Sequence, residues 1–199
     1  MTPVVALLAL AAVILVGSAI ATGVEAAILT VNPIQVHTLT QQRVPGARAL
    51  ERIKARPGRA LALLVVANNL FNISGSMLLG SQADGVFLGE GGLGLGGAAG
   101  LIAFNVAFTL LVILFAEILP KTIGNSFAMP IGLVASRVLL LVERISLPLL
   151  LLLEKLMPAI TAEAELTTNE REIHLMARLG SQQGQIEADE AAMIGKVFA

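Results

Sequence analysis

Three long stretches of this 199-residue chain contain no charged side chain: residues 1–24, 60–83 and 91–116. A helix rises 1.5 Å per residue, so about 20 residues cross a hydrocarbon core of about 30 Å. Each stretch is long enough, and they predict transmembrane helices at about 3–29, 60–79 and 101–119. We therefore expect an all-α membrane protein with three transmembrane helices.

The composition agrees with a membrane protein. Hydrophobic residues make up 56% of the chain and charged residues 14%, against about 25% charged in a typical soluble domain. A net charge of −1 and the absence of Trp and Tyr argue against a nucleic-acid partner. The chain has no Cys, which excludes disulfides and thiolate metal sites. No nucleophile with an adjacent base and no nucleotide motif is visible, so we expect no enzyme.

The first apolar stretch has an alternative interpretation as a signal peptide, because Ala19-Ile20-Ala21 resembles a cleavage site. Against it, the stretch has no basic start and exceeds the 7–15 apolar residues of a signal peptide.

A fourth apolar stretch, residues 131–157, is interrupted by Arg137, Glu143, Arg144 and Pro148. A pair of amphipathic helices at the membrane surface fits this pattern. A short or broken fourth span is the alternative, because the cost of charge in a bilayer is contested.

The loops differ in charge. The first carries six basic residues, namely Arg43, Arg48, Arg52, Lys54, Arg56 and Arg59. The second has no Lys or Arg, but Asp84, Glu90 and a glycine run without the Lys-Ser/Thr ending of a phosphate loop. The positive-inside rule predicts a multi-pass protein of the cell (inner) membrane with an external N-terminus and a cytoplasmic C-terminus.

The last forty residues are polar. Thr167 and Glu170 have capping-box spacing, which predicts a helix ending near Gly180 or Gly184, with a second helix from about Glu187. We expect a transmembrane domain over 1–157 and an acidic helical bundle over 158–199. The apolar face open at residue 199 suggests either a truncated chain or a connector to something further. His37 and His174 have no second His nearby and are expected to be solvated.

Polar residues recur inside the predicted spans, where they are costly and usually line a path or a site. They are Ser18, Thr22 and Glu25 in the first, Asn68, Asn69, Asn72, Ser74 and Ser76 in the second, and Asn105 and Glu117 in the third. Pro120 has no N–H and cannot donate to the carbonyl of Ala116, which becomes available to a ligand.

This inventory of hydroxyl, amide, carbonyl and carboxylate oxygens suits hard cations such as Mg²⁺, Ca²⁺ or Na⁺. Two plainer readings stay open. The Ser and Asn side chains can simply join helices or subunits, and Glu117 can pair with Lys121 one turn on.

Three motifs in order resemble the transmembrane domain of the CorC/CNNM (cyclin M) magnesium transporter family. They are Ser18 with Thr22-Gly23-Val24-Glu25-Ala26-Ala27, then Asn68-Asn69-Leu70-Phe71-Asn72-Ile73, then Glu117-Ile118-Leu119-Pro120-Lys121-Thr122. The resemblance covers nearly the whole chain. It implies a homodimer in membrane lipid with three spans per subunit, a belt of helices from about 126 to 157, and paired CBS domains that are absent here.

The resemblance also implies magnesium export, coupled to sodium entry. The core ligands of Mg²⁺ would be Ser18, Asn69, Asn72 and Glu117, with Thr22, Asn68, Ser74 and the Ala116 carbonyl close by. Glu25 would be structural or part of a sodium path. The alternative function is a non-transporting magnesium sensor that relays occupancy to cytoplasmic domains.

Overall fold

A computed structural model describes residues 3–89, 97–156, 170–182 and 187–197. The described residues form helices and no strand, and three helices are long and apolar enough to span a membrane, which confirms the all-α membrane class. The chain divides into two compact units, residues 1–163 and 164–199. The predicted boundary between residues 157 and 158 lies outside the described residues.

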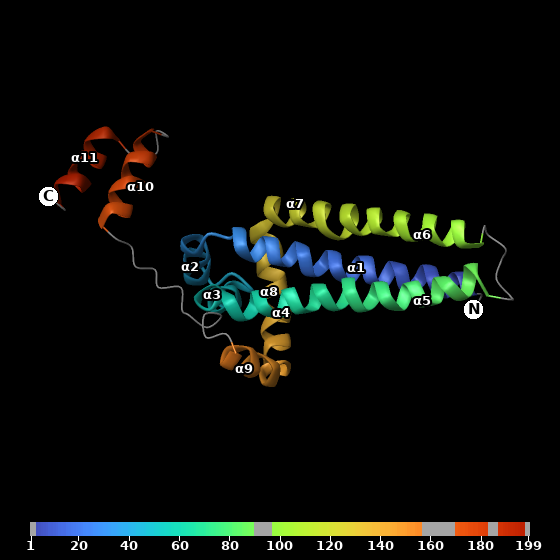
Figure 1. The fold of residues 1–199 in the computed structure, drawn as a ribbon. Helices are drawn as coiled ribbons and strands as arrows, with labels where there is room; N and C mark the ends of the chain where they lie inside the picture. Colours follow the sequence, from blue (N-terminus) through green and yellow to red (C-terminus); the bar gives the residue numbers. More distant parts are fainter. Residues whose placement is uncertain (1–2, 90–96, 157–169, 183–186, 198–199) are drawn as a thin grey trace. The chain divides into compact units, whose positions relative to one another are not determined.

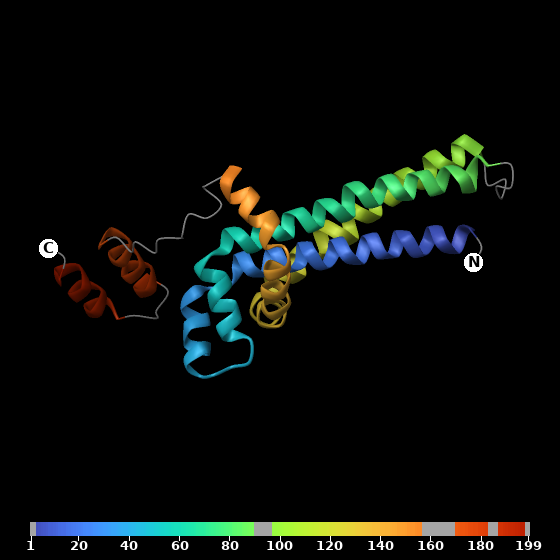
Figure 2. The same cartoon turned by 90° about the horizontal axis from the view of Figure 1, so that it is seen from below.

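The three spans run side by side in the first unit (Figures 1 and 2). The first span is α1 (Pro3–Thr30). The second span consists of α4 (Pro57–Asn69), a π-helical segment η1 (Leu70–Ser74) and α5 (Gly75–Phe87). The third span consists of α6 (Gly97–Leu111), a second π-helical segment η2 (Val112–Ile118) and α7 (Leu119–Ser126). The second and third helices are longer than the predicted 60–79 and 101–119. A helix satisfies its own backbone hydrogen bonds, so it continues past the apolar residues into polar ones such as Asp84.

Small residues bring α1 and α7 into backbone contact. A Cβ on Gly124 of α7 would lie 2.3 Å from the carbonyl oxygen of Gly23 and 3.0 Å from the Cβ of Ala26. Near the end of both helices, Thr30 Oγ1 donates to Asn125 Oδ1 at 2.8 Å. Helix pairs in membranes commonly pack through such small residues, because there is no hydrophobic force between helices in lipid.

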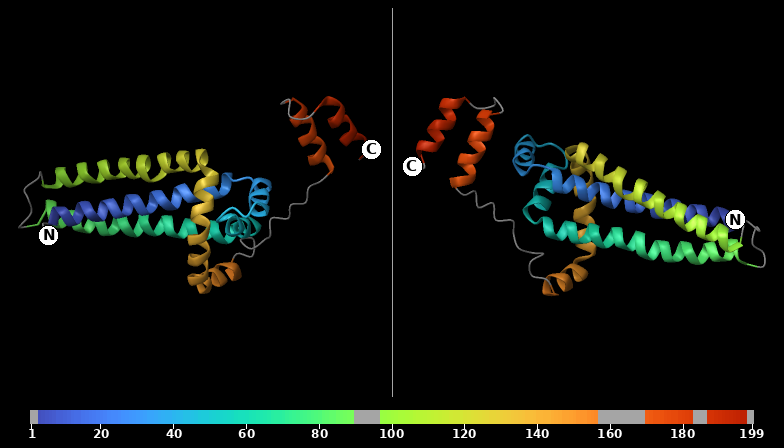
Figure 3. Two further views of the ribbon diagram at one scale, coloured as in Figure 1. Left: turned by 180° about the vertical axis from the view of Figure 1, so that it is seen from behind. Right: turned by 45° about the horizontal axis from the view of Figure 1, so that its top comes forward.

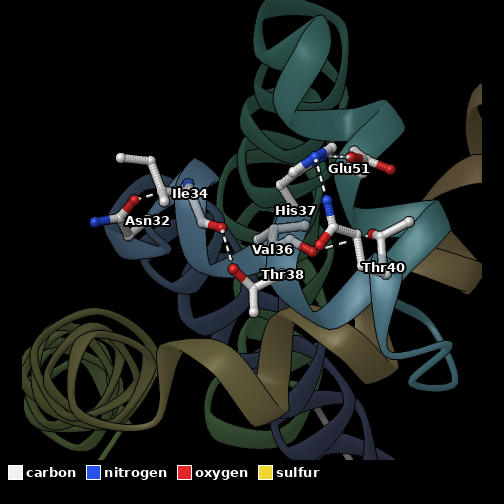
Figure 4. A network of polar contacts seen from close by, with 8 residues as sticks. Asn32, Ile34, Val36, His37, Thr38, Thr40 and Glu51 are labelled. Atoms are coloured by element: carbon white, nitrogen blue, oxygen red, sulfur yellow. Dashed lines mark hydrogen bonds and ion pairs between the residues drawn. The ribbon is translucent and has the colours of Figure 1, made fainter.

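The basic first loop is a helical hairpin, which the sequence analysis did not predict. It consists of α2 (Pro33–Gln41) and α3 (Ala47–Ala55). Asn32 caps α2 by accepting from the N–H of Ile34 at 2.9 Å. Across the hairpin, the Nδ1 of His37 donates to Glu51 Oε1 at 2.8 Å, and Gln41 donates to the other ring nitrogen at 3.1 Å (Figure 4). His37 is exposed, as expected, but it is hydrogen-bonded.

The fourth apolar stretch forms two helices, as predicted: α8 (Ala128–Ile145) and α9 (Leu147–Leu156). They separate at Ser146, and Pro148 lies in the first turn of α9, where its missing N–H costs least. Helix α8 crosses the spans instead of running beside them (Figures 1 and 3). Its N-terminal half packs on the hairpin, where Ser136 Oγ donates to the carbonyl of Gly46 at 3.3 Å.

The second unit contains α10 (Glu170–Gln182) and α11 (Ala188–Val197), close to the predicted positions. The N–H of Glu187 donates to Glu190 Oε2 at 3.1 Å, half of a capping box that begins α11. Thr167 and the rest of the predicted cap of α10 lie outside the described residues.

Candidate functional site

Four polar side chains from the first two spans meet at one oxygen, the Oδ1 of Asn68. Ser18 Oγ donates to it at 2.6 Å, Thr22 Oγ1 at 3.4 Å and Asn72 Nδ2 at 3.1 Å. Ser18 and Thr22 are one turn apart on α1, and Asn68 and Asn72 are one turn apart on the second span. These four residues, called the polar cluster below, are thus two i, i+4 faces turned toward each other.

The polar cluster contains an acceptor without a donor. Asn72 Oδ1 is buried and has no hydrogen-bond partner among the described residues. The amide is oriented by its Nδ2, which is engaged with Asn68, so its oxygen faces away from that bond. An unpaired buried carbonyl oxygen costs about 1–3 kcal/mol. A cation that binds this oxygen would remove that cost.

The structure places the other predicted ligands differently. Ser18 and Thr22 are buried, whereas Asn69, Ser74 and Glu117 are exposed and take no part in the hydrogen bonds of the polar cluster within the described chain. Asn69 follows Asn68 by about 100° around the helix, so only one of the two can face α1. The structure brings Asn68 toward Ser18, where the resemblance favoured Asn69 as the core ligand. The ligand roles themselves stay predictions.

The second and third spans each change from α-helical to π-helical geometry at predicted ligands. Segment η1 contains Asn72 and Ser74, and η2 contains Ala116 and Glu117. Single π turns inside α-helices occur frequently at functional sites. No pattern in the sequence predicts these π-helical segments, and the related sequence signal is Pro120, two residues after η2.

Pro120 acts at the end of η2. The N–H of Leu119 donates five residues back, to Leu114, and position 120 has no N–H to offer the carbonyl of Ala116. Ala116 itself is 1% exposed, so this carbonyl belongs to the packed side of the span. Whether this carbonyl is available to a ligand stays a prediction, because in the i, i+5 pattern of η2 its donor would be the N–H of Lys121.

The three spans bring their polar residues to a similar depth. Counted at 1.5 Å per residue, Ser18, Asn68 and Glu117 lie about 18, 16 and 14 Å from Thr30, Pro57 and Ser126. Those three helix ends share the end of the bundle that carries α2, α3 and α8 (Figure 1). By the same count Thr22 lies about 12 Å and Asn72 about 22 Å from these helix ends, so the polar cluster and the carboxylate occupy a layer about 10 Å deep.

The chemistry of this layer is oxygen-only. The described residues contain no group of three or more His, Cys, Asp and Glu that could hold a metal. Hydroxyl, amide, main-chain and single carboxylate oxygens suit a hard cation. Among the described residues, Glu117 forms no ion pair with Lys121, which removes the local salt bridge as the reason for that carboxylate.

The sequence did not predict two contacts at the end of the bundle that carries α2, α3 and α8. Lys54 Nζ on α3 donates at 3.2 Å to the carbonyl of Ile28, in the last turns of α1. A cation at a helix C-terminus is favourable, while burial lowers the pKa of Lys54. Arg59 at the start of α4 lies 3.7 Å from Glu143 of α8. The helix that carries Lys54 had a sequence signal, the apolar spacing of Ala47, Leu50 and Ile53, which makes α3 an amphipathic helix.

Comparison with known proteins agrees with this architecture. Residues 9–190 match the model of the family described as "Cyclin M transmembrane N-terminal domain". A UPF0053 protein of Synechocystis sp. is 37% identical over 187 residues, or 94% of this chain and 51% of the relative. A UPF0053 inner membrane protein of Escherichia coli is 30% identical over 136 residues (68% and 30%), and a UPF0053 protein of Mycobacterium tuberculosis is 29% identical over 194 residues (95% and 43%). The chain thus spans about half or less of the length of these curated relatives.

Proposed function

Because the chain belongs to the cyclin M transmembrane N-terminal domain family, we propose that it is the membrane domain of a magnesium transporter that exports Mg²⁺ in exchange for Na⁺. The basic hairpin between the first two spans favours an external N-terminus and a cytoplasmic C-terminus in the inner membrane. The cation passes between the three spans, through the layer that holds the polar cluster and Glu117.

The buried, unpartnered Asn72 Oδ1 carries this proposal. Around it, the hydroxyls of Ser18 and Thr22 have their protons directed to Asn68, so their lone pairs are free to face a cation. Mg²⁺ gives up its water reluctantly and prefers six oxygens at 2.0–2.1 Å. Two hydroxyls, one amide oxygen, the Ala116 carbonyl and the Glu117 carboxylate offer such oxygens from three spans.

Release is as necessary for a transporter as binding. The site has one carboxylate, and that carboxylate is exposed in this arrangement of the spans. An alternating-access cycle would bring Glu117 toward the polar cluster in one state and away from it in the other. Sodium or the membrane potential then biases the two states.

The test is magnesium flux into and out of proteoliposomes, with and without a sodium gradient. We compare the unchanged chain with Asn72→Leu and Glu117→Ala, and with Asn105→Leu as the matched control. Asn105 is an exposed amide on the third span outside the polar cluster. We expect sodium-dependent flux in the unchanged chain and the control, and none in the other two variants. Undiminished flux in Asn72→Leu would refute the proposed site.

The same samples distinguish a transporter from the alternative function, a non-transporting magnesium sensor. A sensor would bind Mg²⁺, detected as protection of the unchanged chain from thermal unfolding, without any flux. In that case the transport proposal for this chain would be abandoned. Association into a homodimer, which the family resemblance implies, is measured on the same preparation by mass.

A further inference from the structure

An apolar cavity of about 650 Å³ lies where α8 crosses α1 and α4. Its walls carry only apolar residues, including Ile20, Ala67, Phe71, Ile131, Val134 and Val138. The volume is that of a site for a small organic ligand. Water does not fill a cavity without polar partners, so the lining favours a hydrocarbon occupant.

The cavity is open to the surface that would face lipid. Val134 and Val138 on α8 are 74% and 61% exposed, and Ile20 on α1 is 62% exposed. The apolar stripe of α8 continues beyond the cavity through Leu141 and Ile145, which are also exposed. An alkyl chain can therefore enter from the bilayer without passing a polar barrier.

A second apolar groove, of about 490 Å³, lies on the adjoining face of α1, against α7. It shares Ile20, Val24 and Ile131 with the first cavity. Two grooves that diverge from one junction match the two chains of a phospholipid better than one free fatty acid or one protein helix.

Charges mark where a lipid headgroup would lie. Arg137 is next to Val138 on α8, is exposed, and forms no ion pair or hydrogen bond with another described residue. Arg144 lies on the same face two turns on. An amphipathic helix with an exposed apolar stripe lies in the membrane interface, so these guanidinium groups are at headgroup depth. Anionic phosphate complements them.

We propose that the crossing of α1, α4 and α8 binds an anionic two-chain phospholipid, with its acyl chains in the two apolar grooves and its phosphate at Arg137. The lipid lies directly behind the polar cluster. Ala67 and Phe71, which line the cavity, alternate with Asn68 and Asn72 of the cluster. A Cβ on Gly17 would lie 2.4 Å from the ring of Phe71, so this wall is closely packed. The lipid thus supports the wall that positions the cluster.

The chain has no Trp and no Tyr, which permits a single-reporter test. Phe71→Trp places an indole fluorophore in the cavity wall, and Phe104→Trp on α6 places one outside it, beside Phe87 and Phe108. The purified chain in detergent is titrated with brominated-chain phosphatidylglycerol or phosphatidylcholine. We expect saturable quenching of the Phe71→Trp variant, at about fivefold lower phosphatidylglycerol than phosphatidylcholine. Quenching of the Phe104→Trp variant should rise without saturation.

The charge contribution is tested in the Phe71→Trp background. Arg137→Gln should abolish the preference for phosphatidylglycerol, and Arg48→Gln, an exposed arginine of α3, should leave it unchanged. Equal quenching curves for the two indole variants would overturn the proposal. So would fluorescence of the Phe71→Trp variant that responds to protein concentration and not to lipid, because a second copy of the chain would then fill the cavity. If Phe71→Trp does not fold, mass spectrometry of the unchanged chain must find retained phosphatidylglycerol, and its absence refutes the site.

Discussion

The packing of α1 on α7 makes Gly124→Ala a strong test of the structure. The added Cβ would lie 2.3 Å from the carbonyl oxygen of Gly23, and both atoms belong to backbones that cannot rotate away. Ordinary contact begins at 3.4 Å, so the two helices have to move apart by about 1 Å. Overpacking of this kind costs up to about 3 kcal/mol. The helix propensity of Ala returns about 1 kcal/mol, which leaves a net loss of about 2 kcal/mol.

The matched control is Gly80→Ala on α5. A Cβ there has no atom within 4 Å, so the substitution adds only helix propensity and should stabilise the protein by up to about 1 kcal/mol. The free energy of unfolding is measured in mixed micelles by far-ultraviolet circular dichroism, because the chain has no Trp for fluorescence. We expect Gly124→Ala to be about 3 kcal/mol less stable than Gly80→Ala. Equal stabilities would show that α1 and α7 do not pack as described.

Three further outcomes are expected. Asn68→Leu removes the acceptor of three donors and should lower the free energy of unfolding by about 1–3 kcal/mol, and Ser18→Ala should lower it by about 1 kcal/mol. If the two effects add in the double mutant, the two residues do not share the Asn68 oxygen as described. Burial lowers the pKa of Lys54. Between that lowered pKa and 10.5 the unfolded chain binds more protons than the folded chain, so the free energy of unfolding rises with pH. This rise should vanish in Lys54→Met. The hydrogen bond from His37 lowers the pKa of Glu51 from 4.5. The contribution of Glu51 to the stability of the hairpin is therefore complete above pH 4.5 and is lost as the pH falls through the lowered pKa. Amide exchange of α2 and α3 should increase at that low pH, and also at neutral pH in Glu51→Gln.

The sequence was sufficient to predict the elements whose cause is local. Charge-free length predicted the three spans, and Arg137, Glu143 and Pro148 marked the fourth apolar stretch as two helices. The i, i+4 spacing of Ser18 with Thr22, and of Asn68 with Asn72, predicted two polar faces, and the structure joins them.

Other features depend on packing and had no adequate local signal. The π-helical segments η1 and η2 insert their extra residue where α1 packs on both spans, and propensity does not encode that choice. Whether Asn68 or Asn69 faces α1 follows from the helix phase fixed by this packing. The hairpin α2–α3 had a signal, the Asn32-Pro33 helix start, but its basic residues favoured interpretation as a loop.

The separation in sequence between Ser18 and Asn68 has a consequence for biosynthesis. The two residues are 50 positions apart, and Thr30 and Asn125 are 95 apart. At about 5–20 residues per second, the ribosome adds the partner of Ser18 roughly 3–10 s after Ser18 itself. During that interval α1 reaches the bilayer with its polar face unmatched. Hydroxyls are tolerated during this interval, because Ser and Thr can bond to the carbonyl four residues back, as Thr109 does with Asn105 at 2.8 Å. A helix that must enter the membrane before its partners exist can therefore carry hydroxyls at its centre, while the amides of the polar cluster and Glu117 belong to the spans made later.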